Sequence, residues 1–324
     1  MTSKGTLLIT GASGFVGRNL SIHLEPLFSK IILCSRNISE DSFDHSVNSK
    51  YLFARMDINE ADKIEKLFAE NKPDYVIHSA GIRDIRYAET HPMECLQTNI
   101  NGSVHIAKAA IKNECKAVIG ISSTRAAMPV SGIYGMSKSF MERIFYDFNA
   151  QSDVQFMNVR LGNIAWAPSS VLDDWKIMLD ATGIIKTTGY NMSRLFLTIN
   201  ETADIMDVIF SNSEKFAGFT VVPDMKTAKI GDILHKFIET FGGQYESLPP
   251  LVPEKKDDYL IGQEEISYTK SVRLDNRLFY LVSLVKQDEL LANNLDFFQG
   301  MKMSDTEIIQ MITGSPKKVL SYKI

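Results

Sequence analysis

The feature that most constrains how this 324-residue chain can fold is the stretch 7–20, where an apolar run leads through three glycines into a helical pattern. The apolar run predicts a buried strand, and the pattern after the last glycine predicts the start of a helix. Gly11 permits a sharp turn, Gly14 permits close approach to a pyrophosphate, and Gly17 lets the helix lie near the strand. This order favours binding of dinucleotide phosphates at the helix N-terminus. A plain strand-to-helix turn is the alternative interpretation, because such turns also favour glycine.

The next part of the chain repeats the same alternation of apolar runs and helical patterns. Apolar runs at 30–34, 51–54, 75–77 and 116–121 predict parallel strands. Helical patterns lie between them, as in 61–70 and 92–113. Repeated units of this kind predict an α/β fold, a doubly wound parallel sheet of the Rossmann type with right-handed connections.

Arg36 follows the second predicted strand directly after Ser35. NAD-specific folds usually carry an acidic residue here for the ribose 2′-hydroxyl, whereas an arginine pairs with a 2′-phosphate. The sequence therefore favours NADP as cofactor, with NAD as the alternative. A solvated surface charge is the other interpretation of Arg36.

A candidate catalytic group follows the fifth predicted strand. Tyr134 and Lys138 are four residues apart and share one helix face. An ammonium beside the phenol is expected to lower the tyrosine pKa toward neutrality, which makes Tyr134 a candidate general base. The hydroxyl of Ser123 or Thr124, at the end of the preceding strand, is expected to orient the proton.

Composition and charge exclude several other classes of protein. The chain is 44% hydrophobic and 23% charged, with a formal net charge of −4, which gives no electrostatic reason to expect nucleic acid. The three cysteines are not spaced like metal ligands, so no metal site is expected. We interpret them as reduced thiols and not as a disulfide framework. No run is long enough for a membrane span, and the first strand begins too close to Met1 for a signal peptide. We therefore expect a cytoplasmic protein.

Taken together, these motifs resemble the extended short-chain dehydrogenases/reductases. The resemblance is narrower to the bacterial polysaccharide-biosynthesis branch, which contains inverting UDP-N-acetylglucosamine 4,6-dehydratases and related epimerases. The segments that carry it, beside the glycines and the Tyr-Lys pair, are 34–36, 88–89, 92–94, 98–102, 159–163, 192–198, 253–255 and 260–261.

The resemblance assigns the remaining site residues. It implies that Asp57 contacts the adenine and that Asn99 belongs to a helix-bending network near the tyrosine. The full expected cofactor set is Gly11, Ser13, Gly14, Phe15, Val16, Gly17, Ser35, Arg36, Asp57, Ile58, Ala80, Gly81, Asn99, Tyr134 and Lys138. For the substrate it implies that Asn163 and Arg194 lie by the nucleotide-sugar diphosphate and that Glu254 lies by the nucleoside.

The chain departs from the family pattern at positions that take part in the reaction or face the sugar. Thr124 and Arg125 stand where the dehydratases have an Asp-Lys pair that assists loss of water. A threonine hydroxyl is a poor proton donor, and an arginine cannot accept a proton. Arg83 and Asp84 replace a Lys-His pair in a loop that faces the sugar. We count Arg83, Asp84 and Arg125 as candidate substrate residues, although a surface acid is the simpler interpretation of Asp84.

The regular alternation of predicted strands and helices ends after residue 165, which suggests two domains. We expect a cofactor domain over 1–165, completed by about 195–223, and a smaller discontinuous α/β lid over 166–194 and 224–324.

The expected function is NADP-dependent modification of a nucleotide sugar in surface polysaccharide or glycan synthesis, with a UDP-N-acetylhexosamine as the expected substrate. Because the expected elimination groups are missing, we rank a 4-epimerase first and a 4,6-dehydratase second. A 4-keto-sugar reductase and a non-catalytic NADP-binding regulator are further alternatives. The resemblance also implies a homo-oligomer.

Overall fold

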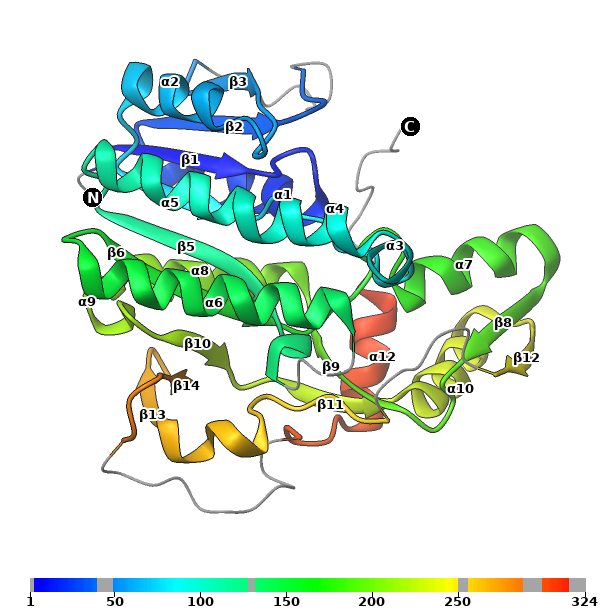
Figure 1. Ribbon diagram of the computed structural model, residues 1–324. Helices are drawn as coiled ribbons and strands as arrows, with labels where there is room; N and C mark the ends of the chain where they lie inside the picture. The colour runs from blue at the N-terminus through cyan, green and yellow to red at the C-terminus, as the bar shows by residue number, and fades with distance from the viewer. Residues whose placement is uncertain (1–2, 40–48, 128–131, 250–255, 288–298, 315–324) are drawn as a thin grey trace.

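The computed structural model describes residues 3–39, 49–127, 132–249, 256–287 and 299–314. Its main feature is a nine-stranded sheet (Figure 1). In spatial order the strands are β13 (Thr269–Leu274), β14 (Arg277–Val282), β10 (Thr220–Pro223), β6 (Gln155–Leu161), β5 (Ala117–Ser123), β4 (Tyr75–His78), β1 (Thr6–Thr10), β2 (Lys30–Ser35) and β3 (Tyr51–Arg55).

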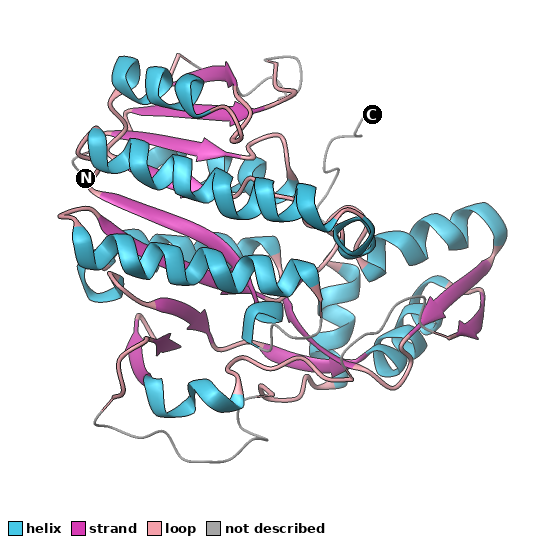
Figure 2. Cartoon of the chain, in the orientation of Figure 1, coloured by secondary structure: helices cyan, strands magenta, loops and turns pink. Residues whose placement is uncertain are grey.

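Helices cover both faces of this sheet and build most of the smaller domain (Figure 2). They are α1 (Phe15–His23), α2 (Ala61–Asn71), α3 (Ile85–Thr90), α4 (Pro92–Leu96), α5 (Gly102–Lys112), α6 (Ile133–Gln151), α7 (Val171–Thr182), α8 (Ile199–Ser211), α9 (Ser213–Phe216), α10 (Ile230–Phe241) and α12 (Asp305–Thr313). Shorter helical turns are η1 (Glu25–Leu27), η3 (Gln97–Asn101), η4 (Thr124–Ala127) and η6 (Gln263–Tyr268).

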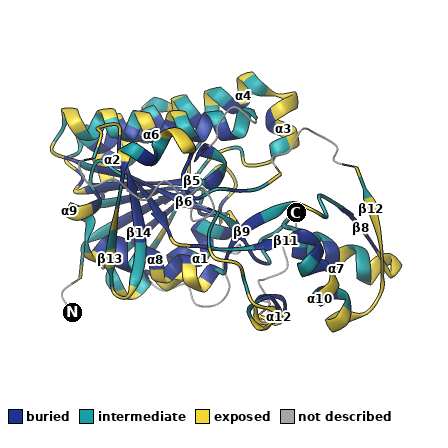
Figure 3. Ribbon diagram, turned by 90° about the horizontal axis from the view of Figure 1, so that it is seen from below, coloured by how far each residue is buried: buried dark blue, intermediate teal, exposed yellow. Residues whose placement is uncertain are grey.

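The central strands are buried on both faces, which explains why their sequences read as continuous apolar runs. Alternate residues of β1 enter different cores: Leu7 and Ile9 pack with α1 and α8, while Leu8 packs with α2, α5 and α6. Figure 3 shows the buried strands enclosed between helices whose outer faces are exposed. The neighbours from β3 to β10 pair in parallel, so the doubly wound parallel α/β fold predicted from the sequence is confirmed.

One edge of the sheet differs from the expectation. β14 pairs antiparallel with β10, and β13 pairs antiparallel with β14. Both strands fall inside the range 224–324 that the sequence assigned to the lid. They extend the large sheet instead, because the backbone of β10 offers an unpaired edge that a returning hairpin can cover.

The smaller domain has its own core. Its strands form a three-stranded sheet of β11 (Lys226–Lys229), β9 (Ser193–Leu197) and β7 (Asn163–Ile164), and a two-stranded sheet of β12 (Gln244–Leu248) and β8 (Ile184–Thr188). Trp175, Phe237 and Ile312 are fully or almost fully buried in this core, which joins α7, α10 and α12. Within the described residues, every helix is too short or too polar to span a bilayer.

Candidate active site

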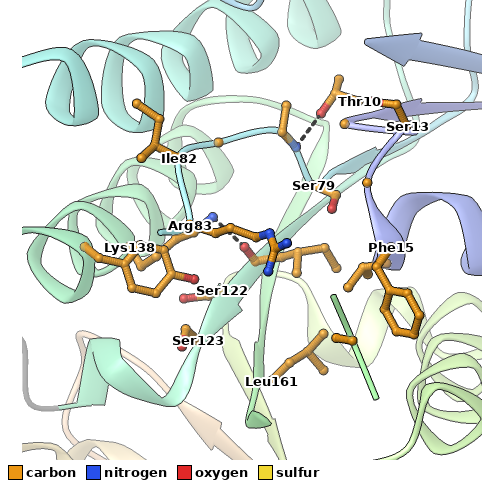
Figure 4. A pocket seen from close by; sticks show the side chains of 18 of the residues that line it. Thr10, Ser13, Phe15, Ser79, Ile82, Arg83, Ser122, Ser123, Lys138 and Leu161 are labelled. Atoms are coloured by element: carbon orange, nitrogen blue, oxygen red, sulfur yellow. Dashed lines mark hydrogen bonds between the residues drawn. The ribbon is translucent and has the colours of Figure 1, made fainter. Parts of the chain in front are cut away.

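A cavity of about 470 Å³ opens at the carboxyl ends of the parallel strands. This is where ligands bind in doubly wound folds, because the loops that follow the strands converge there. Figure 4 shows part of its lining, from Thr10 at the end of β1 to Ser123 at the end of β5. Seventeen of the expected residues line it: Gly11, Ser13, Gly14, Phe15, Val16, Ser35, Arg36, Asp57, Ile58, Ala80, Gly81, Arg83, Ser123, Arg125, Tyr134, Lys138 and Asn163.

The glycine turn forms one wall of the cavity. Gly11 has φ +69°, which a side chain would strain, and a Cβ on Gly17 would lie 2.7 Å from the Gly11 carbonyl oxygen. Gly17 therefore does not line the cavity but lets α1 approach the turn. The N-terminus of α1 has no side-chain cap and no acidic residue in its first turn. Its exposed N–H groups and positive dipole end fit the phosphates of a dinucleotide.

Residues at the ends of β2 and β3 line the side of the cavity where the adenosine of the cofactor is expected. Ser35 Oγ lies 2.6 Å from Ser13 Oγ, so β2 is tied to the glycine turn. Arg36 lines the cavity just beyond, where a 2′-phosphate would lie in this fold. Asp57 also lines the cavity, and its Oδ1 accepts a hydrogen bond from the Asn59 backbone N–H at 2.9 Å.

Tyr134 lies in the first turn of α6, partly buried and facing the cavity. It hydrogen-bonds the Ser123 hydroxyl. Burial raises the pKa of Tyr134 above its ordinary value, while the Ser123 hydrogen bond and the charges of Arg125 and Arg83 oppose that rise. The net direction is opposite to the lowering expected from the sequence, because the cost of burying a phenolate outweighs the nearby cations.

Lys138 lies one turn further along α6 and is 6% exposed. Its Nζ donates to the Ile121 carbonyl oxygen at 2.8 Å, which fixes the ammonium against the end of β5. Burial lowers the pKa of Lys138 to about 8, and the carboxylate of Glu142 opposes the shift. The ammonium is therefore charged at neutral pH but loses its proton in the mildly alkaline range.

Asn99 lies in η3, a π-helical turn between α4 and α5. Its Nδ2 donates to Ser137 Oγ at 2.9 Å and to the Ile82 carbonyl at 3.0 Å, and its Oδ1 accepts from the Ile82 N–H at 2.7 Å. Asn99 does not line the cavity. It holds the loop after β4 against α6, next to Tyr134.

The sequence reasoning missed a buried ionic cluster behind the site. Ser122 lines the cavity and donates to Glu142 Oε1 at 2.6 Å. Arg160 on β6, 1% exposed, pairs with Glu142 at 2.7 Å and with Glu265 of η6 at 2.6 Å. One signal was present in the sequence: Glu142 follows Lys138 by four residues and Tyr134 by eight, so all three share a helix face.

Three of the expected substrate residues line the cavity. Arg83 donates from both Nη atoms to the Pro168 carbonyl at 3.3 Å, and Figure 4 shows its side chain extending across the middle of the cavity. Arg125 follows Ser123 at the end of β5. Asn163 Nδ2 donates to the Leu195 carbonyl at 3.0 Å and to Asp258 Oδ2 at 3.2 Å.

Other expected residues lie elsewhere. Thr124 is buried and does not line the cavity, so Ser123 is the hydroxyl that meets Tyr134. Asp84 caps α3 by accepting from the Tyr87 N–H at 2.9 Å. Arg194 does not line the cavity; its Nη1 donates to the carbonyls of Ser193 and Lys256. Glu254 lies outside the described residues.

A doubly wound sheet with a glycine turn and a Tyr-Lys pair at one cavity defines the class as an extended short-chain dehydrogenase/reductase. Within that class, residues 7–260 match the family described as polysaccharide biosynthesis protein. The chain belongs to this family, as the resemblance indicated.

Individual relatives align with most of the chain. A UDP-N-acetylglucosamine 4,6-dehydratase (inverting) of Campylobacter jejuni is 25% identical over 314 residues, 94% of this chain and 92% of the relative. A UDP-glucose 4-epimerase of Rickettsia felis is 25% identical over 274 residues, 81% of this chain and 79% of the relative. The X-ray structure of Pen from Bacillus thuringiensis matches with a TM-score of 0.84 at 23% identity, covering 97% of this chain and 98% of that chain. This last match shows the fold.

Proposed function

We propose that this protein is an NADP-dependent nucleotide-sugar 4-epimerase of polysaccharide or glycan synthesis, with Tyr134 as the proton-transfer group. NAD is the alternative cofactor. The observation that carries the proposal is that Tyr134, Ser123 and Lys138 share one cavity with the glycine turn. The turn, the open N-terminus of α1 and Arg36 fit a dinucleotide with a 2′-phosphate. When bound, an oxidised nicotinamide would accept a hydride from the sugar and add a positive charge to the site.

The residues of the chain have separable roles in this reaction. Tyr134 takes the proton of the C4 hydroxyl and later returns it, while Ser123 orients that proton through its hydrogen bond to the phenol. Lys138, held by the Ile121 carbonyl, supplies the positive charge that favours phenolate. Asn99 keeps the adjacent loop in place through Ile82.

The test is turnover with a Tyr134→Phe variant. NADP and a panel of UDP-sugars are supplied and products are followed by NMR; the wild type should interconvert C4 epimers. The variant should lose about 10²- to 10⁴-fold in rate, because the proton-transfer group is gone. Tyr146→Phe on the same helix, outside the described cavity lining, is the matched control and should keep full rate. Unchanged turnover in Tyr134→Phe would remove this residue from the mechanism.

A 4,6-dehydratase is the second candidate, because the Campylobacter relative with that name aligns over 94% of this chain. The described lining contains no acid-base pair beside Tyr134 for that elimination, since Arg125 cannot accept a proton. A 4-keto-6-deoxy product in the same NMR experiment would favour the dehydratase over the epimerase.

A further inference from the structure

A fully buried histidine lies at the end of β4, next to the loop that lines the cavity. His78 is the last residue of β4, and its partner across the parallel pair is Thr10, the last residue of β1. Residues 79–83, which follow His78, all line the cavity. Both ring nitrogens of His78 lie within hydrogen-bond distance of a buried hydroxyl. The ring is therefore fully satisfied, as buried polar groups require.

The Nδ1 side of the ring faces the glycine turn. Nδ1 lies 2.9 Å from Thr10 Oγ1, and Thr10 Oγ1 accepts a hydrogen bond from the Ala80 backbone N–H at 3.2 Å (Figure 4). Thr10 and Ala80 both line the cavity. The two backbones touch here, since a Cβ on Gly11 would lie 2.7 Å from the Ala80 nitrogen. The contact between His78 and Thr10 therefore acts where the glycine turn meets the loop after β4.

The Nε2 side of the ring faces α5 and, through it, α6. Nε2 lies 3.0 Å from Ser103 Oγ, and Ser103 Oγ donates to the Asn99 carbonyl oxygen at 2.6 Å. The Asn99 side chain donates to Ser137 Oγ at 2.9 Å, and Ser137 Oγ donates to the Tyr134 carbonyl oxygen at 2.8 Å. A chain of polar contacts thus runs from the end of β1 to the first turn of α6.

One placement of hydrogens satisfies all of these contacts. The Asn99 carbonyl oxygen can only accept, so the single hydroxyl hydrogen of Ser103 goes to it. Nε2 must then donate to Ser103, which leaves Nδ1 of a neutral ring to accept from the Thr10 hydroxyl. Burial, and to a smaller extent the charge of Lys138, lowers the pKa of His78 to about 3, so the ring is neutral near pH 7.

An apolar side chain could fill this space but could not replace these contacts. Thr10 and Ser103 are fully buried, so removing the ring takes one polar contact from each hydroxyl in a place closed to bulk water. The two hydroxyls bind separate segments: Thr10 binds the backbone after β4, and Ser103 binds the π-helical turn η3. The ring is therefore the polar link between these segments.

We infer that His78, as the Nε2–H tautomer, is a positioning residue that couples the cofactor end of the cavity to the helix that carries Tyr134. Its Nδ1 fixes the spacing between the glycine turn and the loop after β4 through Thr10. Its Nε2 fixes η3 and, through Asn99, the first turn of α6. The reaction that is positioned in this way is that of the proposed function, on which the inference rests, and no chemical step is added to it.

The first experiment reads the tautomer of His78 in the full-length wild type. Long-range ¹H–¹⁵N spectra of histidine-labelled protein should show a neutral ring with its proton on Nε2, unchanged from about pH 6 to 9. The signal is assigned by its absence from His78→Gln and by contacts with the Phe145 ring, whose centroid lies 6.2 Å away. A proton on Nδ1, or a ring that titrates in this range, would overturn the inference even if no variant folds.

The second experiment separates the two sides of the ring with partial mimics. His78→Gln places an amide nitrogen near the position of Nε2, so it keeps the Ser103 contact and loses that of Thr10. His78→Asn places an amide oxygen near the position of Nδ1, so it keeps the Thr10 contact and loses that of Ser103. Calorimetry measures the NADP affinity, and epimerisation of UDP-sugars measures kcat.

We expect His78→Gln to weaken NADP binding about 2- to 10-fold with little change in kcat, the range for one lost hydrogen bond. His78→Asn should lower kcat by a similar factor with little change in NADP affinity. A purely structural role would change both quantities by the same factor in both variants, and this result would overturn the inference. His235→Gln, at an exposed position of α10, is the matched control and should change neither quantity.

A double-mutant cycle tests whether His78 acts through each hydroxyl. In Thr10→Val combined with His78→Gln, the loss of NADP affinity should be no larger than in the weaker-binding single variant, because both changes remove the same contact. Ser103→Ala combined with His78→Asn should behave in the same way for kcat. Additive losses in either pair would mean that His78 does not act through that hydroxyl and would overturn the inference.

The tautomer and the NADP affinity are measured without turnover, so the proposed reaction and the role of His78 can fail separately. A wild type that binds NADP but converts no UDP-sugar would refute the epimerase. In that case an Nδ1–H tautomer or additive losses of NADP affinity would still overturn the role of His78, and the opposite results would support it. A wild type that binds neither NADP nor NAD would refute the cofactor site and this role together.

Discussion

Lys138 shows how one buried side chain sets the pH range of this site. Its ammonium is held by the Ile121 carbonyl and is 6% exposed, so desolvation disfavours the charge and lowers its pKa to about 8. Glu142, one turn further on, opposes that shift. The balance between burial and one carboxylate therefore decides how much of Lys138 is charged at a given pH.

At this residue scale we predict that kcat/KM falls as pH rises through about 8, because Lys138 loses its proton there. Glu142→Gln removes the charge that raises the Lys138 pKa, so the alkaline limb should move to lower pH. The measurement is the pH profile of kcat/KM, with Glu264→Gln on the exposed part of η6 as control. An alkaline limb that stays in place in Glu142→Gln contradicts this account.

At the element scale, helix α6 combines the proposed proton-transfer residues with packing against the sheet. It presents Tyr134, Lys138 and Glu142 on one face, and Glu142 joins the helix to Arg160 on β6. Arg160 extends the same chain of contacts to Glu265 of η6. The helix that carries the phenol is thus fixed to the sheet by a buried charge cluster whose hydrogen bonds offset the cost of desolvation.

Arg160→Ala should lower the free energy of unfolding by about 3–5 kcal/mol, because it leaves the 7%-exposed Glu142 without its cation. Urea denaturation followed by circular dichroism measures this. Arg277→Ala removes an exposed pair with Asp204 and should cost no more than about 1 kcal/mol. If the two variants are equally stable, the buried cluster does not hold the helix in place.

At the scale of the whole molecule, the smaller domain depends on a segment near the end of the chain. α12 contributes Ile308, Met311 and Ile312 to the core shared with α7 and α10. The Trp166 indole N–H donates to the Met311 carbonyl at 3.0 Å. Both tryptophans of the chain, Trp166 and Trp175, belong to this region, so tryptophan emission reports on the smaller domain.

Ile312→Ala should destabilise the smaller domain by about 2–5 kcal/mol, because it leaves a cavity at a fully buried position. The expected result is an earlier urea midpoint for tryptophan emission. Ile309→Ala on the same helix, at a 40%-exposed position, should shift the midpoint far less. Equal shifts in the two variants would mean that α12 does not complete this core.

Local patterns accounted for much of the fold and part of the site. The apolar runs, the glycine turn and the Tyr134-Lys138 spacing depend on residues near one another in the chain, and short-range periodicity reports such features. The convergence of Ser123, Tyr134 and the glycine turn also followed, because parallel strands end at the same edge of the sheet.

The sequence by itself therefore determined the doubly wound sheet, the cofactor turn and the position of the phenol. Only the tertiary structure decided that Ser123 and not Thr124 meets Tyr134, that Asp84 caps a helix, and that Arg194 donates to backbone carbonyls. It also brought Glu265 to Arg160, residues 105 positions apart. Such contacts depend on how segments far apart in the sequence pack together. Local periodicity carries no information about that packing.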